Sequence, residues 1–269
     1  MTTSGISGLR VLVVGASSGI GRGLAVELAA GGAIVAAAAR RAERLKELPD
    51  VVALQCDVTV PGAVDAMVEA AVERLGGLDA LVYAAGLSRL NPLHEASFDD
   101  WVELFAPNVF GAAIVTRAAL PHLLADGSQG RALYLTSDSV EKPYPGMVLY
   151  SSAKAALAAY ALGLANEFPA LKVTDVLVGP TAGTEVANHF DPELFGVWAS
   201  RWFDEGYVRY EMLQVADVVP MIVDTLATDA PPALVRATGA PATYTIDAAR
   251  EAAGSDQPVL GSAIAGGRP

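Results

Sequence analysis

The sequence predicts an α/β fold, a doubly wound parallel sheet of about seven strands with helices on both faces. Short apolar runs alternate with longer helical patterns along most of the 269 residues. The apolar runs are continuous, as in strands that are buried on both faces, and their alternation with helices indicates βαβ units. A glycine-rich turn at residues 15–21 follows the first apolar run and opens directly into a helical pattern.

The elements are expected in strict alternation, each bounded by turn residues. Apolar runs of strand length predict strands at residues 9–14, 33–39, 51–55, 79–85, 133–136 and 171–178. Longer segments rich in alanine and leucine predict helices at residues 20–30, 63–75, 98–124 and 149–168. Gly15 ends the first strand, and Gly31 and Gly32 end the first helix, since glycine tolerates the backbone of tight turns.

The length suits one large domain or two small ones. Because no linker-like break occurs before about residue 246, we place a single domain at residues 1–250. Residues 251–269 are rich in Gly, Ala and Ser with little periodicity, and we expect either a weakly ordered tail or an arm that packs on a partner.

The composition argues against several classes of partner. The net charge of −12 opposes binding to nucleic acid or to anionic membranes through bulk charge. No apolar run is expected to reach the length needed to span a bilayer. The single cysteine, Cys56, cannot form an internal disulfide, and the N-terminal residues lack the pattern of a signal peptide. We therefore expect a cytoplasmic protein.

The glycine-rich turn predicts a nucleotide site. Its glycines allow a tight turn and close backbone approach, while the N-terminus of the following helix offers free N–H groups to a pyrophosphate. An ordinary βα loop is the alternative, although the position between the first strand and helix favours nucleotide binding. The expected contacts are Gly15, Ser17, Ser18, Gly19, Ile20 and Gly21.

The end of the second strand bears on which dinucleotide binds. An acidic residue there would bind a ribose 2′-hydroxyl, but the strand ends in Arg40 and Arg41. Arg40, helped by Ser17, Arg22 or Arg41, could hold a 2′-phosphate, so NADP(H) is preferred and NAD(H) remains possible. In the alternative, both arginines are solvated helix-cap charges. Asp57 could accept from the adenine amino group or serve only as a loop residue.

Tyr150 and Lys154 lie four residues apart in a helical segment. Residues at this spacing share one helix face. An ammonium beside a phenol favours the ionised phenol, so we expect the pKa of Tyr150 to fall and the residue to act in general acid–base catalysis. The alternative is an ordinary exposed contact between neighbouring turns.

Six segments in order resemble the short-chain dehydrogenase/reductase family in its single-domain branch, over residues 9–227. They are the glycine turn, residues 57–58, residues 79–86, residues 108–111, Ser137 and residues 150–154. The resemblance implies a Rossmann-like fold and a catalytic tetrad of Asn108, Ser137, Tyr150 and Lys154. Tyr150 would be the acid in reduction and the base in oxidation, and Ser137 would bind the substrate oxygen. Lys154 would bond the nicotinamide ribose, and Asn108 would fix a water in a proton relay.

The resemblance also implies further cofactor contacts, namely Asp57, Val58, Ala85, Gly86, Pro180 and Thr184, besides Tyr150 and Lys154. One departure concerns structural support. The family's Asn-Asn-Ala-Gly appears here as Tyr83-Ala84-Ala85-Gly86, so a tyrosine replaces an asparagine that bonds neighbouring backbone. Asn108 follows Pro107, which is expected to interrupt the helix over residues 98–124.

The resemblance implies that residues 185–210 form a lid over the substrate within the domain. Seven of the chain's 18 aromatic residues lie between residues 190 and 210 of this expected lid. They favour an apolar or cyclic substrate, or else they pack on the core or on a partner subunit. The candidates to line the substrate pocket are Ser139, Tyr144, Phe190, Trp198 and Trp202. The three histidines lack metal-ligand spacing, so no metal site is expected.

Together these features predict an NAD(P)-dependent oxidoreductase that interconverts a carbonyl and a secondary alcohol. Two alternatives remain: a cofactor-binding regulatory or scaffold protein without turnover, and a reductase of an activated C=C or C=N bond. The helices over residues 101–124 and 149–168 carry more apolar surface than one sheet face needs. The resemblance therefore implies a homotetramer or homodimer.

Overall fold

A computed structural model describes residues 5–125, 129–208, 212–228, 231 and 233–237. Its centre is a parallel sheet of seven strands in the order β3-β2-β1-β4-β5-β6-β9. The strands are β1 (Arg10–Val14), β2 (Ile34–Ala39), β3 (Val51–Gln55), β4 (Ala80–Tyr83), β5 (Arg131–Ser137), β6 (Lys172–Val178) and β9 (Leu234–Ala237). The order reverses between β1 and β4, and ligands of such sheets bind at the carboxyl ends beside this reversal. The predicted fold class is confirmed.

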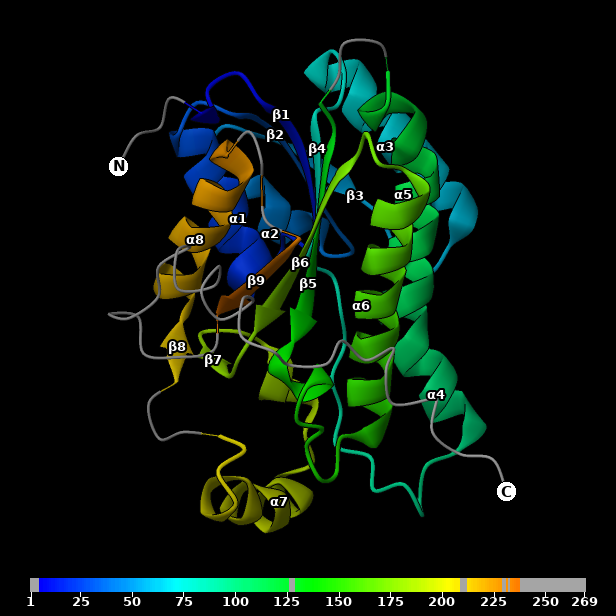
Figure 1. Ribbon diagram of the computed structural model, residues 1–269, viewed down its shortest axis with the longest axis vertical. Coiled ribbons are helices and arrows are strands. Elements are labelled where there is room, and N and C mark those ends of the chain that lie inside the picture. The colour runs from blue at the N-terminus through cyan, green and yellow to red at the C-terminus, as the bar shows by residue number, and fades with distance from the viewer. Residues whose placement is uncertain (1–4, 126–128, 209–211, 229–230, 232, 238–269) are drawn as a thin grey trace.

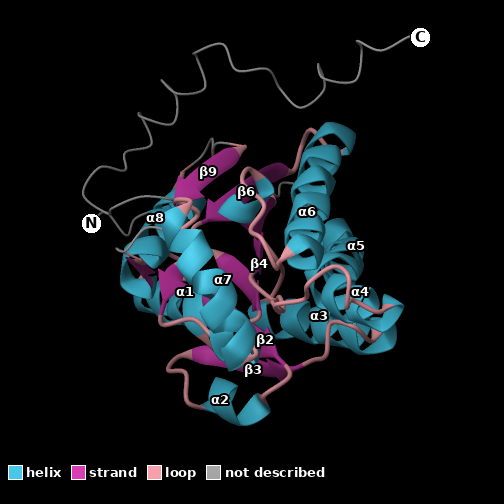
Figure 2. Cartoon of the chain, turned by 90° about the horizontal axis from the view of Figure 1, so that it is seen from below, coloured by secondary structure: helices cyan, strands magenta, loops and turns pink. Residues whose placement is uncertain are grey.

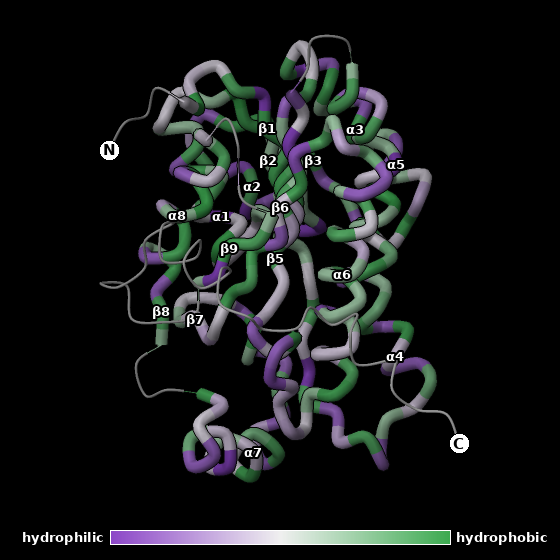
Figure 3. Tube along the Cα trace, viewed as in Figure 1, coloured by the Kyte–Doolittle hydropathy of each residue, from purple (hydrophilic) through white to green (hydrophobic). Residues whose placement is uncertain are grey.

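Helices cover both faces of the sheet (Figure 1). α1 (Gly19–Ala30) and α8 (Val215–Ala227) bury Leu24, Leu28 and Ile222 on one face. α3 (Pro61–Leu75), α5 (Gly111–Leu123) and α6 (Val148–Glu167) cover the other face. Figure 2 shows the two groups on opposite sides of the strands. Most of the central strands are hydrophobic in Figure 3, as burial on both faces requires.

The predicted helix over residues 98–124 is interrupted near its middle. α4 (Phe98–Phe105) starts at a capping box formed by Ser97 and Asp100. A π-helical turn at Ala106–Phe110 follows, and α5 begins at Gly111. Pro107 has no N–H to give to the helix, which explains the interruption. The buried Tyr83 hydroxyl donates to the Pro107 carbonyl over 2.6 Å.

Several elements have no counterpart in the sequence prediction. They are the short helix α2 (Ala42–Lys46), the strand pair β7 (Thr181–Ala182) and β8 (Leu213–Gln214), the helices α7 (Pro192–Asp204) and α8, and the edge strand β9. α7 belongs to the expected lid and lies beyond the carboxyl ends of the central strands (Figure 1). The expected tail, residues 251–269, is outside the described residues.

Two helical stretches, Phe98–Leu123 and Val148–Glu167, are long and apolar enough to cross a membrane by length and composition alone. The expectation that no segment reaches this length is therefore wrong. Val115, Ala119, Leu157 and Ala161 of these stretches belong to the buried cluster on one face of the sheet. Packing in the core explains their apolar composition.

Candidate cofactor and active site

The glycine turn has the close backbone packing that its sequence predicts. Gly15 has φ +91°, and a Cβ there would lie 2.5 Å from the backbone nitrogen of Ala85. A Cβ on Gly21 would lie 2.4 Å from the carbonyl oxygen of Gly15. Larger residues are thus excluded at both positions. The turn therefore packs against the Ala84–Ala85 backbone that follows β4.

The N-terminus of α1 can receive an anion. Helix α1 begins at Gly19, and the preceding residue, Ser18, makes no side-chain capping hydrogen bond. The backbone N–H groups of the first turn are consequently not capped by that side chain, and the helix dipole adds positive potential. A dinucleotide pyrophosphate fits these donors.

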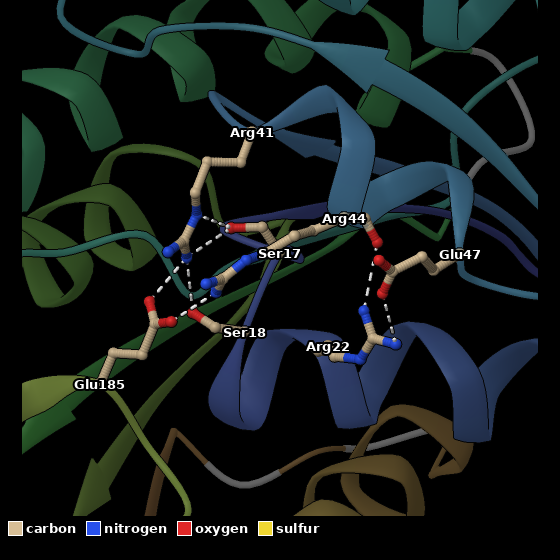
Figure 4. A network of polar contacts seen from close by, with 7 residues as sticks. All are labelled: Ser17, Ser18, Arg22, Arg41, Arg44, Glu47 and Glu185. Atoms are coloured by element: carbon tan, nitrogen blue, oxygen red, sulfur yellow. Dashed lines mark hydrogen bonds and ion pairs between the residues drawn. The ribbon is translucent and has the colours of Figure 1, made fainter.

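The arginine at this turn is Arg41. Its Nη2 donates to Ser17 Oγ over 2.9 Å and to Ser18 Oγ over 3.0 Å (Figure 4). Arg22 turns away and donates to the Arg44 carbonyl over 3.1 Å. Arg40 is exposed, and its charge helps to lower the pKa of Asp57. Arg41, expected only as a helper, is thus the guanidinium in contact with the glycine turn, and phosphate binding by Arg40 stays a prediction.

Asp57 and Val58 follow β3. Asp57 Oδ1 accepts from Thr59 N over 2.9 Å and from Thr59 Oγ1 over 2.7 Å. Burial raises the pKa of Asp57, but the Thr59 hydrogen bonds and the Arg40 charge outweigh it and keep the pKa low. The side chain of Val58 is buried. The expected contact of Asp57 with adenine is compatible with an ionised carboxylate and stays a prediction.

The four tetrad residues converge from three elements. Ser137 ends β5, Tyr150 and Lys154 lie on α6, and Asn108 lies in the π-helical turn. A Cβ added to Gly86, after β4, would lie 2.7 Å from Asn108 Oδ1 and 3.4 Å from Lys154 Nζ. The Ser137 hydroxyl is within hydrogen-bonding reach of the Tyr150 phenol. Residues from distant parts of the sequence therefore form one cluster beside the glycine turn.

Asn108 is fixed through its amide nitrogen. Nδ2 donates to the carbonyls of Leu87 and Leu104, each over 2.8 Å. Its Oδ1 is buried, and no described residue hydrogen-bonds to it. The π-helical turn, held by Tyr83 at Pro107, presents this amide to the site. In the family pattern, an asparagine at the position of Tyr83 bonds neighbouring backbone. Here the Tyr83 hydroxyl bonds the backbone at Pro107 instead.

The predicted effect of Lys154 on Tyr150 is wrong for this arrangement. Burial raises the pKa of Tyr150 to about 12, the Ser137 hydrogen bond lowers it, and the Asp138 charge raises it. Burial lowers the pKa of Lys154 to about 8. The ammonium donates to the Leu135 carbonyl over 2.9 Å and lies 5.9 Å from the Tyr150 ring centroid. Helical spacing brings the residues together, but the ammonium is directed to the strand.

Asp138 lies directly after Ser137 and links it to Tyr144. The Tyr144 hydroxyl donates to Asp138 Oδ2 over 2.9 Å, and Ser137 Oγ donates to Oδ1 over 3.3 Å. Burial raises the pKa of Asp138, and these two hydrogen bonds oppose the rise. Ser139 is buried, and its backbone N–H donates to Ser137 Oγ over 3.2 Å. A carboxylate thus lies beside Ser137, a feature that the tetrad pattern does not include.

The lid aromatics pack onto this network. Trp202, Phe190, Phe203 and Tyr207 form an apolar cluster together with Tyr144, Met147 and Tyr150. Trp202 Nε1 donates to the Pro145 carbonyl over 2.9 Å, and Trp198 lies against Gly146. Tyr210 is outside the described residues. The lid therefore contacts Tyr150 as well as its own aromatics, which agrees with the packing interpretation, and an apolar substrate stays a prediction.

Pro180 and Thr184 follow β6 on the way to the lid. The Thr184 Cα would lie 3.4 Å from a Cβ on Gly19, so this segment crosses the first turn of α1. Thr184 Oγ1 donates to the Thr181 carbonyl over 2.9 Å. Among the described residues, no group of three or more His, Cys, Asp or Glu side chains could hold a metal ion.

Comparison with known proteins gives a consistent result. A family model described as short chain dehydrogenase matches residues 10–193. Glycine betaine reductase ATRR of Emericella nidulans is 36% identical over 198 residues, which are 70% of this chain but 16% of that protein. The chain therefore spans less than a fifth of this relative.

Two further proteins match over most of their length. NADP-dependent 3-hydroxy acid dehydrogenase YdfG of Salmonella typhi is 33% identical over 186 residues, 66% of this chain and 75% of that protein. The crystal structure of a short chain dehydrogenase from Burkholderia cenocepacia J2315 in complex with NADP is 29% identical. The structural match has a TM-score of 0.75 and covers 88% of this chain and 99% of the Burkholderia chain.

Proposed function

This chain belongs to the short-chain dehydrogenase family of oxidoreductases, and we propose that it interconverts a carbonyl and a secondary alcohol with NADP(H) as the preferred cofactor. One observation carries the proposal: Asn108, Ser137, Tyr150 and Lys154 converge beside a glycine turn that can receive a pyrophosphate. A protein that only binds the cofactor would not require a phenol, a hydroxyl and an ammonium in one buried cluster.

The nicotinamide ring, when bound, supplies or accepts the hydride. The protein supplies the proton and the ligand for the reacting oxygen. With a pKa of about 12, the Tyr150 phenol stays protonated at neutral pH and can donate to an oxygen that gains charge during reduction. The Ser137 hydroxyl binds the same oxygen and orients it towards Tyr150. In oxidation, Tyr150 must first lose its proton, which makes this direction favoured at higher pH.

Lys154 adjusts the charge of the site. Its pKa of about 8 leaves most of the ammonium protonated at neutral pH. In that form it bonds the Leu135 carbonyl, and its remaining N–H groups can bond a ribose hydroxyl. Asn108, held at Leu87 and Leu104, offers Oδ1 as an acceptor for a relay from Lys154.

The preference for NADP(H) is supported by local charge. β2 ends without an acidic residue, and Arg41 contacts both serines of the glycine turn. Guanidinium groups and hydroxyls are the donors that recognise phosphate monoesters. The Burkholderia neighbour was solved with NADP, and YdfG is named as NADP-dependent. NAD(H) remains the second cofactor.

The substrate is proposed to be a small apolar or cyclic molecule. The cluster of Trp202, Phe190, Tyr144 and Tyr150 supports an apolar contact surface next to the proton donor. The same site geometry suits reduction of an activated C=C or C=N bond, which is the alternative reaction. A regulatory protein without turnover is the alternative from another class.

A homodimer or homotetramer in the cytoplasm is proposed. Phe98 of α4 is 79% exposed, and Phe110 of the π-helical turn and Leu162 of α6 are also exposed. An apolar surface of this kind fits burial against a second copy. Cys56 is buried with its pKa raised to about 11, which makes the thiol unreactive and suits a reducing compartment.

The test uses Tyr150→Phe with Tyr160→Phe as the matched control on the same helix. Tyr160 packs edge-on against Tyr134 and is outside the tetrad. The wild type is mixed with NADPH and a panel of ketones, quinones, activated alkenes and imines, and loss of absorbance is followed. Tyr150→Phe should lose about 100-fold or more in kcat yet bind NADPH as the wild type does.

Tyr160→Phe should keep its activity. Full activity of Tyr150→Phe would contradict the assigned proton donor. Binding of NADPH without turnover on the whole panel would favour the regulatory alternative.

A further inference from the structure

Glu185 holds the two arginines at the adenosine end of the predicted cofactor site. Its Oε2 accepts from Arg41 Nη2 over 2.6 Å, and its Oε1 accepts from Arg44 Nη1 (Figure 4). Arg41 Nη2 simultaneously donates to Ser17 and Ser18. The carboxylate therefore belongs to one cluster with two guanidinium groups and two serine hydroxyls, in which Arg41 is the shared partner.

The position of Glu185 is fixed by its neighbours in the chain. Thr184 lies against Gly19 of α1, and the Val186 carbonyl accepts from Ser88 Oγ over 2.6 Å. Glu185 is thus held between the glycine turn and the loop after β4, at the start of the segment that leads to α7. Its side chain is 30% exposed, against 43% for Arg41 and 44% for Arg44.

The carboxylate is firmly ionised at any physiological pH. The hydrogen bonds from Arg41 and Arg44 lower the pKa of Glu185 to about 2. A phosphate monoester would seek the same partners, because guanidinium groups and serine hydroxyls are its usual donors. Two anions at one pair of arginines repel each other, so one of them must leave.

We propose that Glu185 is a specificity-determining residue that competes with the 2′-phosphate of NADP(H) for Arg41 and Arg44 and thereby narrows the preference for NADP(H) over NAD(H). The proposal rests on the proposed function, because it assumes that a nicotinamide dinucleotide binds at the glycine turn. NAD(H) carries a 2′-hydroxyl in place of this phosphate, so it makes no demand on the two arginines and leaves the ion pairs intact.

A different role for Glu185 makes a different prediction. If the ion pairs acted as a clasp that closes over either dinucleotide, their loss would weaken NADPH and NADH alike. Competition predicts instead that loss of the carboxylate strengthens NADPH alone. The sign and the selectivity of the change therefore separate the two roles.

The test measures binding by isothermal titration calorimetry for the wild type, Glu185→Gln and the control Glu193→Gln. Glu193 is an exposed glutamate in the first turn of α7, and in the part of the chain that the structure describes it makes no hydrogen bond or ion pair with Arg41 or Arg44. The ligands are NADPH, NADH, adenosine 2′,5′-bisphosphate and adenosine 5′-monophosphate. The last two isolate the 2′-phosphate from the nicotinamide half.

Glu185→Gln should bind NADPH and the bisphosphate about tenfold more tightly, as expected when two partly exposed ion pairs no longer have to be broken. Its affinity for NADH and for the monophosphate should change less than about twofold. Arg41→Met should weaken NADPH and leave NADH unchanged. Glu193→Gln should match the wild type with all four ligands.

Three results for Glu185→Gln would overturn the proposal: an equal change in affinity for NADPH and NADH, no change in either affinity, or weaker binding of NADPH. Each of these results would leave the proposed oxidoreductase function intact. Failure of the wild type to bind either dinucleotide would overturn both. Circular dichroism of each variant confirms that a partly exposed side chain was replaced without loss of the fold.

Discussion

Lys154→Met should make the protein more stable near neutral pH, although it removes the ammonium that we propose acts in catalysis. The ammonium is buried, and its pKa falls from 10.5 to about 8. A difference of about 2.5 between these values corresponds to about 3 kcal/mol of unfavourable free energy below pH 8, at 1.36 kcal/mol for each pKa unit. Methionine has a similar length and fills the same space without charge.

The expected net gain is smaller than this cost. The substitution also removes the hydrogen bond from Nζ to the Leu135 carbonyl, which contributes about 1 kcal/mol. Asp175, whose charge favours the ammonium, loses a compensating cation, although it keeps its 2.5 Å hydrogen bond from Thr136 Oγ1. We therefore expect Lys154→Met to raise the free energy of unfolding at pH 7 by about 1 to 2 kcal/mol.

The pH dependence provides the sharper signature. Between the folded pKa of about 8 and the unfolded pKa of 10.5, the unfolded chain binds the proton and the folded chain does not. Wild-type stability therefore rises with pH across this window, and the advantage of Lys154→Met shrinks. Tyr150 contributes the opposite trend between its unfolded pKa of 10.0 and its folded pKa of about 12. That trend is common to both proteins to a first approximation.

The assay is urea unfolding followed by circular dichroism at pH 7 and pH 10. Lys46→Met is the control, because Lys46 is an exposed residue of α2 paired with Glu43. The control should differ from the wild type by the same small amount at both pH values. If Lys154→Met were less stable than the wild type by the same amount at pH 7 and pH 10, the argument that burial lowers the pKa of Lys154 would be refuted.

Two other substitutions test the support of the site. Tyr83→Phe removes the donor to the buried Pro107 carbonyl and should lower the free energy of unfolding by about 1–3 kcal/mol, measured by urea unfolding; unchanged stability would show that water replaces the phenol. Asp138→Asn removes a charge that raises the pKa of Tyr150. It should therefore shift the rise of alcohol oxidation with pH to lower pH in a kcat profile, and a shift to higher pH would contradict this assignment.

The predictability of the fold from sequence differed between buried and peripheral elements. The strands β1 and β2 are apolar runs buried in the sheet, and their predicted bounds agree with the structure to within one residue. β9 reads Leu-Val-Arg-Ala, is short, and pairs only with β6 in the described part of the chain. α8 contains Pro220, which reads as a helix breaker. Long-range packing decides both, and local patterns do not carry that information.

The candidate site shows the same division. The spacing of Ser137, Tyr150 and Lys154 identifies which residues come together, because each lies on a regular element. It does not say which way Arg40 and Arg41 turn, since both follow the end of β2. That choice depends on the backbone at Arg41, with φ −91° and ψ 85°. The direction of the Lys154 ammonium likewise depends on the Leu135 carbonyl of a strand nineteen residues earlier.

Several buried polar atoms at the site have no hydrogen-bond partner in the part of the chain that the structure describes. Among the described residues, the buried side-chain atoms without a hydrogen-bond partner include Asn108 Oδ1, Ser139 Oγ, Ser151 Oγ and Trp198 Nε1. These residues belong to the tetrad, adjoin Ser137 or Tyr150, or lie in the lid. Each such atom costs about 1–3 kcal/mol, so the core would be more stable with apolar side chains there. A sequence chosen for stability alone would not keep these atoms close to the buried Lys154 ammonium and to the Tyr150 phenol, whose pKa is raised. Their location therefore argues that selection for chemistry shaped this end of the sheet.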